Sequence, residues 1–122
     1  MRGRSPRAFE VDDVGLQGAP GVVVHGEVDI NAAPALGAAL DAAIRDSVGA
    51  FIIDLSDVDF IDSSGVHALL RARGVLGRED RALGVVCPFG PVRRVFEVSG
   101  SAELFVLYGS REEAAAALVP AD

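Results

Sequence analysis

The sequence contains no lysine, and this excludes a phosphate-binding loop of the Gly-x-x-x-x-Gly-Lys type, whose lysine contacts nucleotide phosphates. It contains a single cysteine, Cys87, which cannot form an internal disulfide and lies in an apolar run that indicates a buried, structural thiol. The two histidines, His25 and His67, fall in unrelated parts of the chain without a cysteine pair, so no metal-ligand cluster stands out. The net charge of −7 argues against a nucleic acid as partner.

Long apolar runs are missing as well. No segment approaches the roughly 18 apolar residues of a transmembrane helix, and no hydrophobic stretch follows the basic N-terminus as a signal peptide requires. We therefore expect a soluble, cytoplasmic protein that has no membrane partner. Half of the 122 residues are apolar, which is enough to build one core. The predicted organisation is a basic, disordered tail over residues 1–8 and a single domain over residues 9–119.

Apolar periodicity and turn residues predict an alternation of strands and helices. Two strands joined by a short turn form a hairpin, and the later strands are separated by helices, which implies right-handed crossovers and parallel pairing. The predicted fold class is α/β: one domain with a mostly parallel sheet of about four to five strands, an antiparallel edge hairpin and about four helices packed on it. A capping box, Ser110 with Glu113, opens the last helix. The expected strands cover residues 9–14, 21–28, 51–55, 83–87 and 104–107, and the expected helices cover residues 31–46, 63–77, 92–98 and 110–119.

The stretch Asp62-Ser63-Ser64-Gly65 lies between the third predicted strand and the helix that follows it. A serine at this place can cap the helix by accepting a hydrogen bond from a free backbone N–H of the first turn. The same N–H groups and the helix dipole favour an anion. Ser63 is therefore either a helix cap or an exposed hydroxyl that can carry a phosphate. Four carboxylates are expected to make the approach to this serine acidic; they belong to Asp54, Asp57, Asp59 and Asp62.

The surroundings of this serine do not favour nucleophilic catalysis. The stretch is not a Gly-x-Ser-x-Gly elbow. His67 lies one helical turn after Ser63, but a catalytic base usually comes from another element and is held by a third group. We expect an ordinary exposed histidine and a protein that is not an enzyme. The arginines that follow, from Arg71 to Arg94, are expected to form a solvated surface of mixed charge.

Three blocks of sequence stand in an order and spacing that match a known family. They are Gly26 to Asp29, Asp54 to Gly65, and Val92 to Gly100, with a helix opened by Pro34 after the first block. Together they resemble the STAS domain, in particular that of the bacterial anti-sigma factor antagonists. The resemblance extends from Phe9 to Val119 and covers nearly the whole chain.

The resemblance implies a regulatory protein that switches partners. In this family the unphosphorylated antagonist binds an anti-sigma factor that is itself an ATP-dependent serine kinase, and the sigma factor is thereby freed for transcription. The kinase phosphorylates the first serine of the motif, here Ser63, with ATP and magnesium that it supplies itself, and a PP2C-type phosphatase removes the phosphate. No cofactor of the antagonist's own is implied. Asp29 matches an acid that lies near the phosphoacceptor and contacts the kinase.

The residues predicted to bind the partner come from these blocks and from the helix that follows. His67 stands where the family often has a second glycine, so its ring either narrows the choice of partner or is a neutral surface replacement. An alternative within the same fold is a STAS subunit of a lipid-transport or sensory assembly that has no phosphorylation switch. The predicted partner-binding residues are Asp29, Asp62, Ser63, Ser64, Gly65 and His67.

Overall fold

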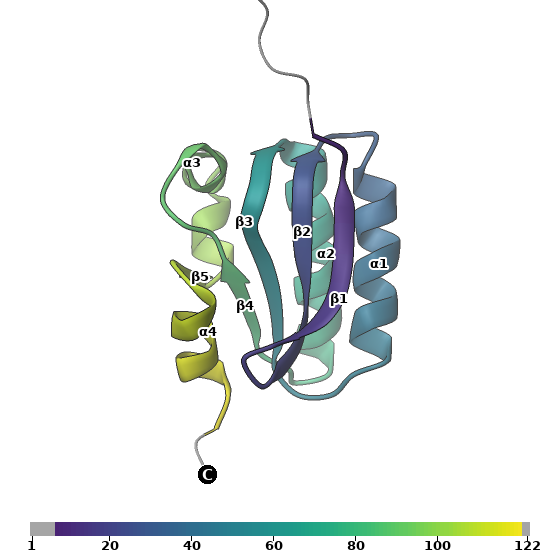
Figure 1. Ribbon diagram of the computed structural model, residues 1–122, viewed down its shortest axis with the longest axis vertical. Coiled ribbons are helices and arrows are strands. Elements are labelled where there is room, and N and C mark those ends of the chain that lie inside the picture. The colour runs from purple at the N-terminus through teal and green to yellow at the C-terminus, as the bar shows by residue number, and fades with distance from the viewer. Residues whose placement is uncertain (1–6, 121–122) are drawn as a thin grey trace, which may run out of the picture.

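The computed structural model describes residues 7–120, which form one mixed sheet with helices on both faces (Figure 1). The five strands lie in the order β1-β2-β3-β4-β5; β1 and β2 are antiparallel, and every other pair is parallel. The predicted α/β fold with an antiparallel edge hairpin is confirmed. The elements in chain order are β1 (Glu10–Leu16), β2 (Ala19–Val28), α1 (Ala33–Arg45), β3 (Phe51–Ile61), α2 (Ser63–Arg78), β4 (Leu83–Val86), α3 (Pro91–Val98), a 3-10 turn (Ser101–Leu104), β5 (Leu107–Tyr108) and α4 (Arg111–Leu118).

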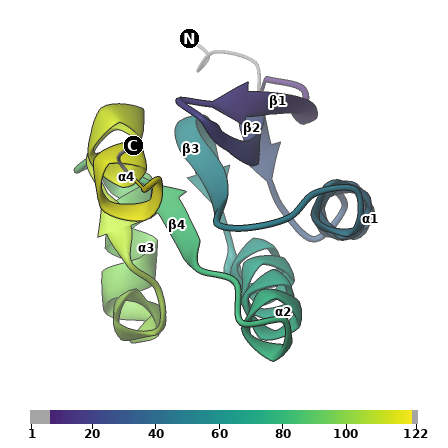
Figure 2. The same cartoon turned by 90° about the horizontal axis from the view of Figure 1, so that it is seen from below.

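Successive side chains of the sheet enter two hydrophobic clusters, one on each face. The larger cluster joins Val24 and Ile53 to apolar residues of α1, α2 and α3. The smaller cluster joins Val23 and Ile52 to Ala114 of α4. Seen from below, α1 and α2 pack side by side, and α4 lies on the other side of β4 from α3 (Figure 2). Among the helices of residues 7–120, none combines the length and the hydropathy needed to cross a membrane.

β3 is longer than predicted, because it extends over Phe51–Ile61 although the largely apolar run ends at Leu55. Its second half stays paired with β2 as far as Val28, through two register shifts. Polar side chains such as Asp57 break the apolar pattern in this half, but partners on neighbouring strands satisfy them. The additional length carries β3 to the edge of the sheet where the predicted site lies.

The segment after α3 also differs from the predicted strand over residues 104–107. It begins with the 3-10 turn, and β5 is limited to Leu107–Tyr108. The reason is Phe105, whose buried ring meets that of Phe96 edge to face, with ring centroids 5.5 Å apart. Because the Phe105 ring is buried in the core, residues 104–106 do not continue the strand, and pairing with β4 begins only at Leu107.

Two local predictions at the ends of elements are confirmed. At the start of α4, Ser110 Oγ accepts a hydrogen bond from the backbone N–H of Glu113 over 3.1 Å. The Glu113 carboxylate in turn accepts from the N–H of Gly109 over 2.7 Å, one residue before the cap. Cys87 is buried just past β4, and burial raises the pKa of its thiol to about 11. The thiol is therefore protonated at neutral pH and plays a packing role.

Residues 1–6 of the predicted tail (residues 1–8) lie outside the part of the chain that the structure describes. Arg7, in contrast, contacts β3: its Nε lies 2.5 Å from Asp59 Oδ2, and its Nη1 lies 3.2 Å from Asp57 Oδ1. Gly26 makes room for this path. Its φ is +86°, and a Cβ at this position would clash with the carbonyl oxygen of Ala8. Arg7 and Ala8 thus pack against the second halves of β2 and β3.

Candidate functional site

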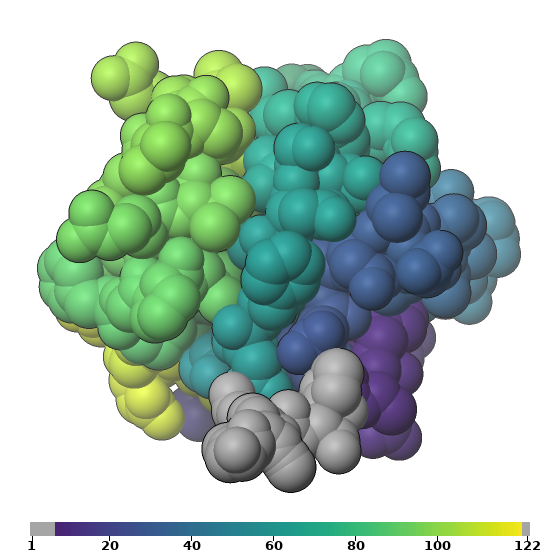
Figure 3. All heavy atoms as spheres, turned by 90° about the horizontal axis from the view of Figure 1, so that it is seen from above, coloured from purple at the N-terminus to yellow at the C-terminus, as the bar shows by residue number. Residues whose placement is uncertain are grey.

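Asp29 and Asp62 follow directly on the carboxyl ends of two neighbouring parallel strands. Val28, at the end of β2, pairs with Ile61, at the end of β3, and the N–H of Asp62 donates to the carbonyl oxygen of Val28 over 3.2 Å. The structure therefore brings Asp29 beside the stretch Asp62–Gly65, although the two aspartates are far apart in the chain. Figure 3 looks onto this edge, where the end of β3 (teal) lies between the start of α1 (blue) and the segment after β4 (green).

Asp62 is the N-cap of α2, and the alternative in which Ser63 caps this helix is wrong. Its Oδ1 accepts hydrogen bonds from the N–H groups of Ser64 (2.9 Å) and Gly65 (3.3 Å). A carboxylate is favoured here because it also meets the positive end of the helix dipole. Ser63 becomes the first residue of α2 and is exposed, and within residues 7–120 its hydroxyl makes no hydrogen bond. The hydroxyl is therefore open to a partner.

Gly65 allows the first turn of α2 to sit directly on the ends of the strands. A Cβ at this position would lie 2.7 Å from Ile61 Cγ1 and 2.8 Å from Val28 Cγ1, closer than packed carbon atoms approach. Gly65 itself is buried, so it positions the backbone of the site and presents no side chain to a partner. The place of Ser63 above the sheet follows from this close packing.

The carboxylate of Asp29 is held in a fixed orientation by the turn that leads into α1. Its Oδ1 accepts hydrogen bonds from the backbone N–H groups of Asn31 and Ala32, both over 3.0 Å. Among the described residues, none donates a hydrogen bond to its Oδ2. Asp29 therefore presents one unpaired, partly exposed carboxylate oxygen at the same edge as Ser63.

The prediction that Asp54 adds to an acidic approach to Ser63 is wrong. Asp54 is fully buried on the α4 face of the sheet, where its carboxylate bonds to Arg111 Nε and to the backbone N–H of Ser56. It precedes the end of β3 by seven residues, which at about 3.3 Å per residue is on the order of 20 Å. Asp54 ties α4 to β3 and takes no part in the site.

The carboxylates of Asp57 and Asp59 are likewise paired with cationic partners, Arg7 and His25. Arg7 contacts both carboxylates. The His25 ring lies between two carboxylates, with Nδ1 2.5 Å from Asp57 Oδ2 and Nε2 2.9 Å from Asp12 Oδ2. The hydrogen bond to Asp57, and then that to Asp12, raises the pKa of His25, while the same bond from His25 lowers the pKa of Asp57. These carboxylates therefore add little uncompensated charge to the site.

Three exposed apolar side chains near the carboxyl ends of the parallel strands were not singled out from the sequence. Ile30 is 68% exposed beside Asp29, Phe60 is 46% exposed two residues before Asp62, and Phe89 is 85% exposed after β4. β2 and β3 end together, so Ile30 and Phe60 flank the serine. β4 ends earlier, at Val86 opposite Asp54, and Phe89 lies in the segment that follows it, near Val58. The signal in the sequence was a large apolar residue within three residues of a strand's end, where turn residues are usual. Apolar area beside charged groups is typical of protein–protein interfaces.

The two remaining predicted binding residues lie in the first two turns of α2. Ser64 is half-buried and His67 is exposed. Within the described residues, the Ser63 hydroxyl and the His67 ring make no hydrogen bond to each other, so the pair lacks the contact that activates a nucleophilic serine. The part of the predicted surface that a partner can reach comprises Asp29, Ser63 and His67, with the edges of Asp62 and Ser64.

Known proteins share this fold and sequence pattern. The STAS domain model matches residues 11–114, and the chain therefore belongs to the STAS domain family. BtrV of Bordetella bronchiseptica, a putative anti-sigma factor antagonist by name, is 36% identical over 95 residues, which cover 77% of this chain and 81% of that protein. The crystal structure of an anti-sigma factor antagonist from Mycobacterium paratuberculosis is 35% identical with a TM-score of 0.80, over 93% of this chain and 94% of that one. The phosphorylated form of SpoIIAA, a Bacillus cell fate determinant, is 26% identical with a TM-score of 0.62, over 90% of this chain and 99% of that one.

Proposed function

We propose that this protein is an anti-sigma factor antagonist controlled by phosphorylation of Ser63. It binds an anti-sigma factor, itself a serine kinase, while Ser63 is unmodified, and it releases that partner once Ser63 is phosphorylated. The observation that carries the proposal is the free Ser63 hydroxyl, which stays exposed at the start of α2 because Asp62 caps the helix. ATP and magnesium come with the kinase, a PP2C-type phosphatase restores the serine, and the output is sigma-factor-dependent transcription in the cytoplasm. The protein itself catalyses no step.

A relative supports phosphorylation within this fold. SpoIIAA has been solved in a phosphorylated form and, as an anti-sigma factor antagonist, in an unphosphorylated form; each form is 26% identical to this chain over 90% of its length. A domain of this architecture therefore accommodates the modification. The exposed serine at the first turn of α2 is the place where this chain can accept a phosphate.

Phosphorylation would act through local charge. A phosphate adds about −1.5 to −2 charges beside the carboxylates of Asp29 and Asp62. The N-terminus of α2 compensates this charge only in part, because Asp62 already accepts the N–H groups of Ser64 and Gly65. Leaving a charge unpaired in an interface costs on the order of 3–5 kcal/mol, which is roughly a 100- to 3000-fold loss of affinity. No change of fold is required.

The surface around Ser63 is suited to a protein partner. Ile30 and Phe60 offer apolar area that a partner can cover. The unpaired oxygen of Asp29 offers a place for an arginine or lysine of the kinase, with the carboxylate already oriented by its turn. We propose that this edge as a whole is the surface that the anti-sigma factor covers.

The first test identifies the modified residue. The protein is incubated with ATP, magnesium and each anti-sigma factor kinase of the organism, and phosphorylated peptides are located by mass spectrometry. We expect one phosphate on Ser63 in the wild type and in Ser64→Ala, and none in Ser63→Ala. Failure of every such kinase to modify Ser63 would refute the switch and favour a STAS subunit of a lipid-transport or sensory assembly.

The second test measures binding to the kinase that modifies Ser63. Ser63→Ala should retain the affinity of the wild type, since only a hydroxyl is removed. Ser63→Asp should bind at least about 100-fold more weakly, because its carboxylate would stay unpaired in the interface. Calorimetric titration measures both constants, and equal affinities of the two variants would contradict the charge mechanism.

A further inference from the structure

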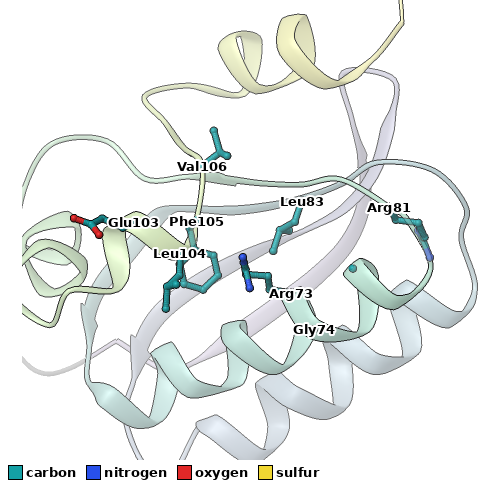
Figure 4. Close-up of a pocket in the computed structure, with 9 residues that line it drawn as sticks. Arg73, Gly74, Arg81, Leu83, Glu103, Leu104, Phe105 and Val106 are labelled. Atoms are coloured by element: carbon teal, nitrogen blue, oxygen red, sulfur yellow. The ribbon is translucent and has the colours of Figure 1, made fainter.

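We propose that the groove between α2 and residues 103–106 is a second docking surface. It binds a segment of a partner protein that contains both acidic and apolar side chains. Its volume is about 420 Å³. Arg73, Gly74 and Gly77 of α2 form one side, and Leu83, Leu104 and Val106 are among the residues of the other (Figure 4). Arg73 follows Ser63 by ten residues along α2, which is roughly 15 Å, so the groove is separate from the proposed phosphorylation site.

The groove exists because α2 carries two glycines that packing does not require. A Cβ at Gly77 would meet no atom of the described residues within 4 Å, and one at Gly74 would meet only Arg78 Nη1, at 3.8 Å. This differs from Gly65 in the same helix, where a Cβ would clash with the strands. Glycine is among the least favourable residues in a helix interior, so its presence at these two positions has a cost to folding. What the two glycines provide is a hollow on the surface of the helix.

The charge along the groove favours an acidic occupant. Arg73 lines the groove and forms no ion pair within residues 7–120, although the protein as a whole carries a net charge of −7. Arg73 extends from α2 toward Phe105 and Leu104, whereas Glu103 points away from it (Figure 4). Arg81, at the other end, is already used, because its guanidinium donates to the carbonyl oxygens of Ile44, in the last turn of α1, and of Gly49, in the loop that follows. Of the two arginines in the lining, Arg73 is thus left for a ligand's carboxylate.

The other wall of the groove is apolar and indicates a peptide segment. Leu104 is 44% exposed and Val106 is 57% exposed, and the 3-10 turn and the short β5 hold them at the surface. Along α2 the groove extends from Arg73 to Gly77, about 6 Å or roughly one helical turn, and it continues to Arg81 beyond the end of the helix. A segment that combines leucine-like side chains with glutamate or aspartate would cover this wall and pair with Arg73.

The test uses the full-length protein labelled with nitrogen-15 and three synthetic peptides of about 12 residues. The acidic probe contains glutamate, leucine and serine; one twin has lysine in place of glutamate, and the other has serine in place of leucine. Titration followed by amide chemical shifts should show the acidic probe perturbing residues 73–83 and 103–106, and neither twin doing so. Ser63→Ala should bind the probe unchanged, which separates this proposal from the phosphorylation switch.

Arg73→Glu and Arg71→Glu form a matched pair, since both arginines are exposed on α2 but Arg71 lies over Gly37 of α1. Arg73→Glu should lower the affinity for the acidic probe roughly tenfold or more, and Arg71→Glu should lower it by less than about twofold. The double variant Gly74→Ala/Gly77→Ala should melt at a higher temperature than the wild type and yet bind the probe roughly tenfold more weakly.

Four results would overturn the proposal. The first two are equal loss of probe binding in the two arginine variants and equal affinity for the acidic probe and its lysine twin. The third is displacement of the probe by inorganic phosphate, which would make the groove an anion site. The fourth is a dependence of the chemical shifts of the groove on protein concentration in the absence of peptide, which would make the groove a contact between two copies.

Discussion

Replacing Gly65 with alanine should destabilise the protein, whereas the same replacement at Gly74, nine residues later in α2, should stabilise it. Both changes add one methyl group to the same helix. At Gly74 the methyl group enters open space, but at Gly65 it meets side chains of Val28 and Ile61 at 2.8 and 2.7 Å. Those two residues are buried and β-branched, so they cannot turn away without disturbing the core.

The two variants share the gain in helix propensity and differ in the clash. Alanine is favoured over glycine in a helix by up to about 1 kcal/mol, and overpacking a core costs typically about 1–3 kcal/mol. Gly74→Ala should therefore gain about 0.5–1 kcal/mol in the free energy of unfolding, and Gly65→Ala should lose up to about 2 kcal/mol. The difference between the variants, about 1–3 kcal/mol, reports the contact alone.

Urea unfolding followed by circular dichroism measures this difference. With a slope of about 1–3 kcal/mol per molar urea, the two midpoints should be separated by on the order of 1 M. Gly65→Ala should also slow the phosphorylation of Ser63 while the protein is still folded, because the first turn of α2 is pushed away from the strand ends. Equal midpoints, or a Gly65→Ala protein that is the more stable of the two, would refute the close packing on which the position of Ser63 depends.

Two further predictions concern charged groups outside the site. Arg111→Met should lower the free energy of unfolding by about 3–5 kcal/mol, because it leaves the Asp54 carboxylate buried without its cation. Asp54→Asn should lower it by only about 1.5–3 kcal/mol, because the freed arginine can turn to water. Equal losses in urea unfolding would contradict this asymmetry. The carboxylates of Asp57 and Asp12 raise the pKa of His25, so its contribution to stability is complete below the unfolded value of about 6.5 and disappears as pH rises through the higher folded value. In the wild type the melting temperature should therefore fall as pH rises above about 6.5, and His25→Gln should reduce this fall. A variant with the wild-type pH profile would show that the histidine cluster does not contribute.

Local sequence patterns were sufficient for most of the architecture. The edge hairpin, the alternation of later strands with helices, the serine cap of α4 and the buried Cys87 all depend on residues that lie close together in the chain. Elements that depend on distant partners were misjudged. The second half of β3 pairs with β2 and has its carboxylates satisfied by Arg7 and His25, and no local pattern shows that. Likewise, Phe105 is buried against Phe96 instead of continuing a strand.

The sequence by itself determined that a hydroxyl stands between a strand and a helix at Ser63, and that the surrounding blocks belong to a STAS domain, because motif order and spacing are properties of the chain. Only the tertiary structure decided which residue caps the helix, since Asp62 and Ser63 compete for the same N–H groups and their geometry settles the outcome. Tertiary structure also placed Asp29 beside Ser63, because β2 and β3 are neighbours and end together. It removed Asp54 from the site for the same kind of reason: a residue's position along a strand and its side of the sheet determine which groups its carboxylate can reach.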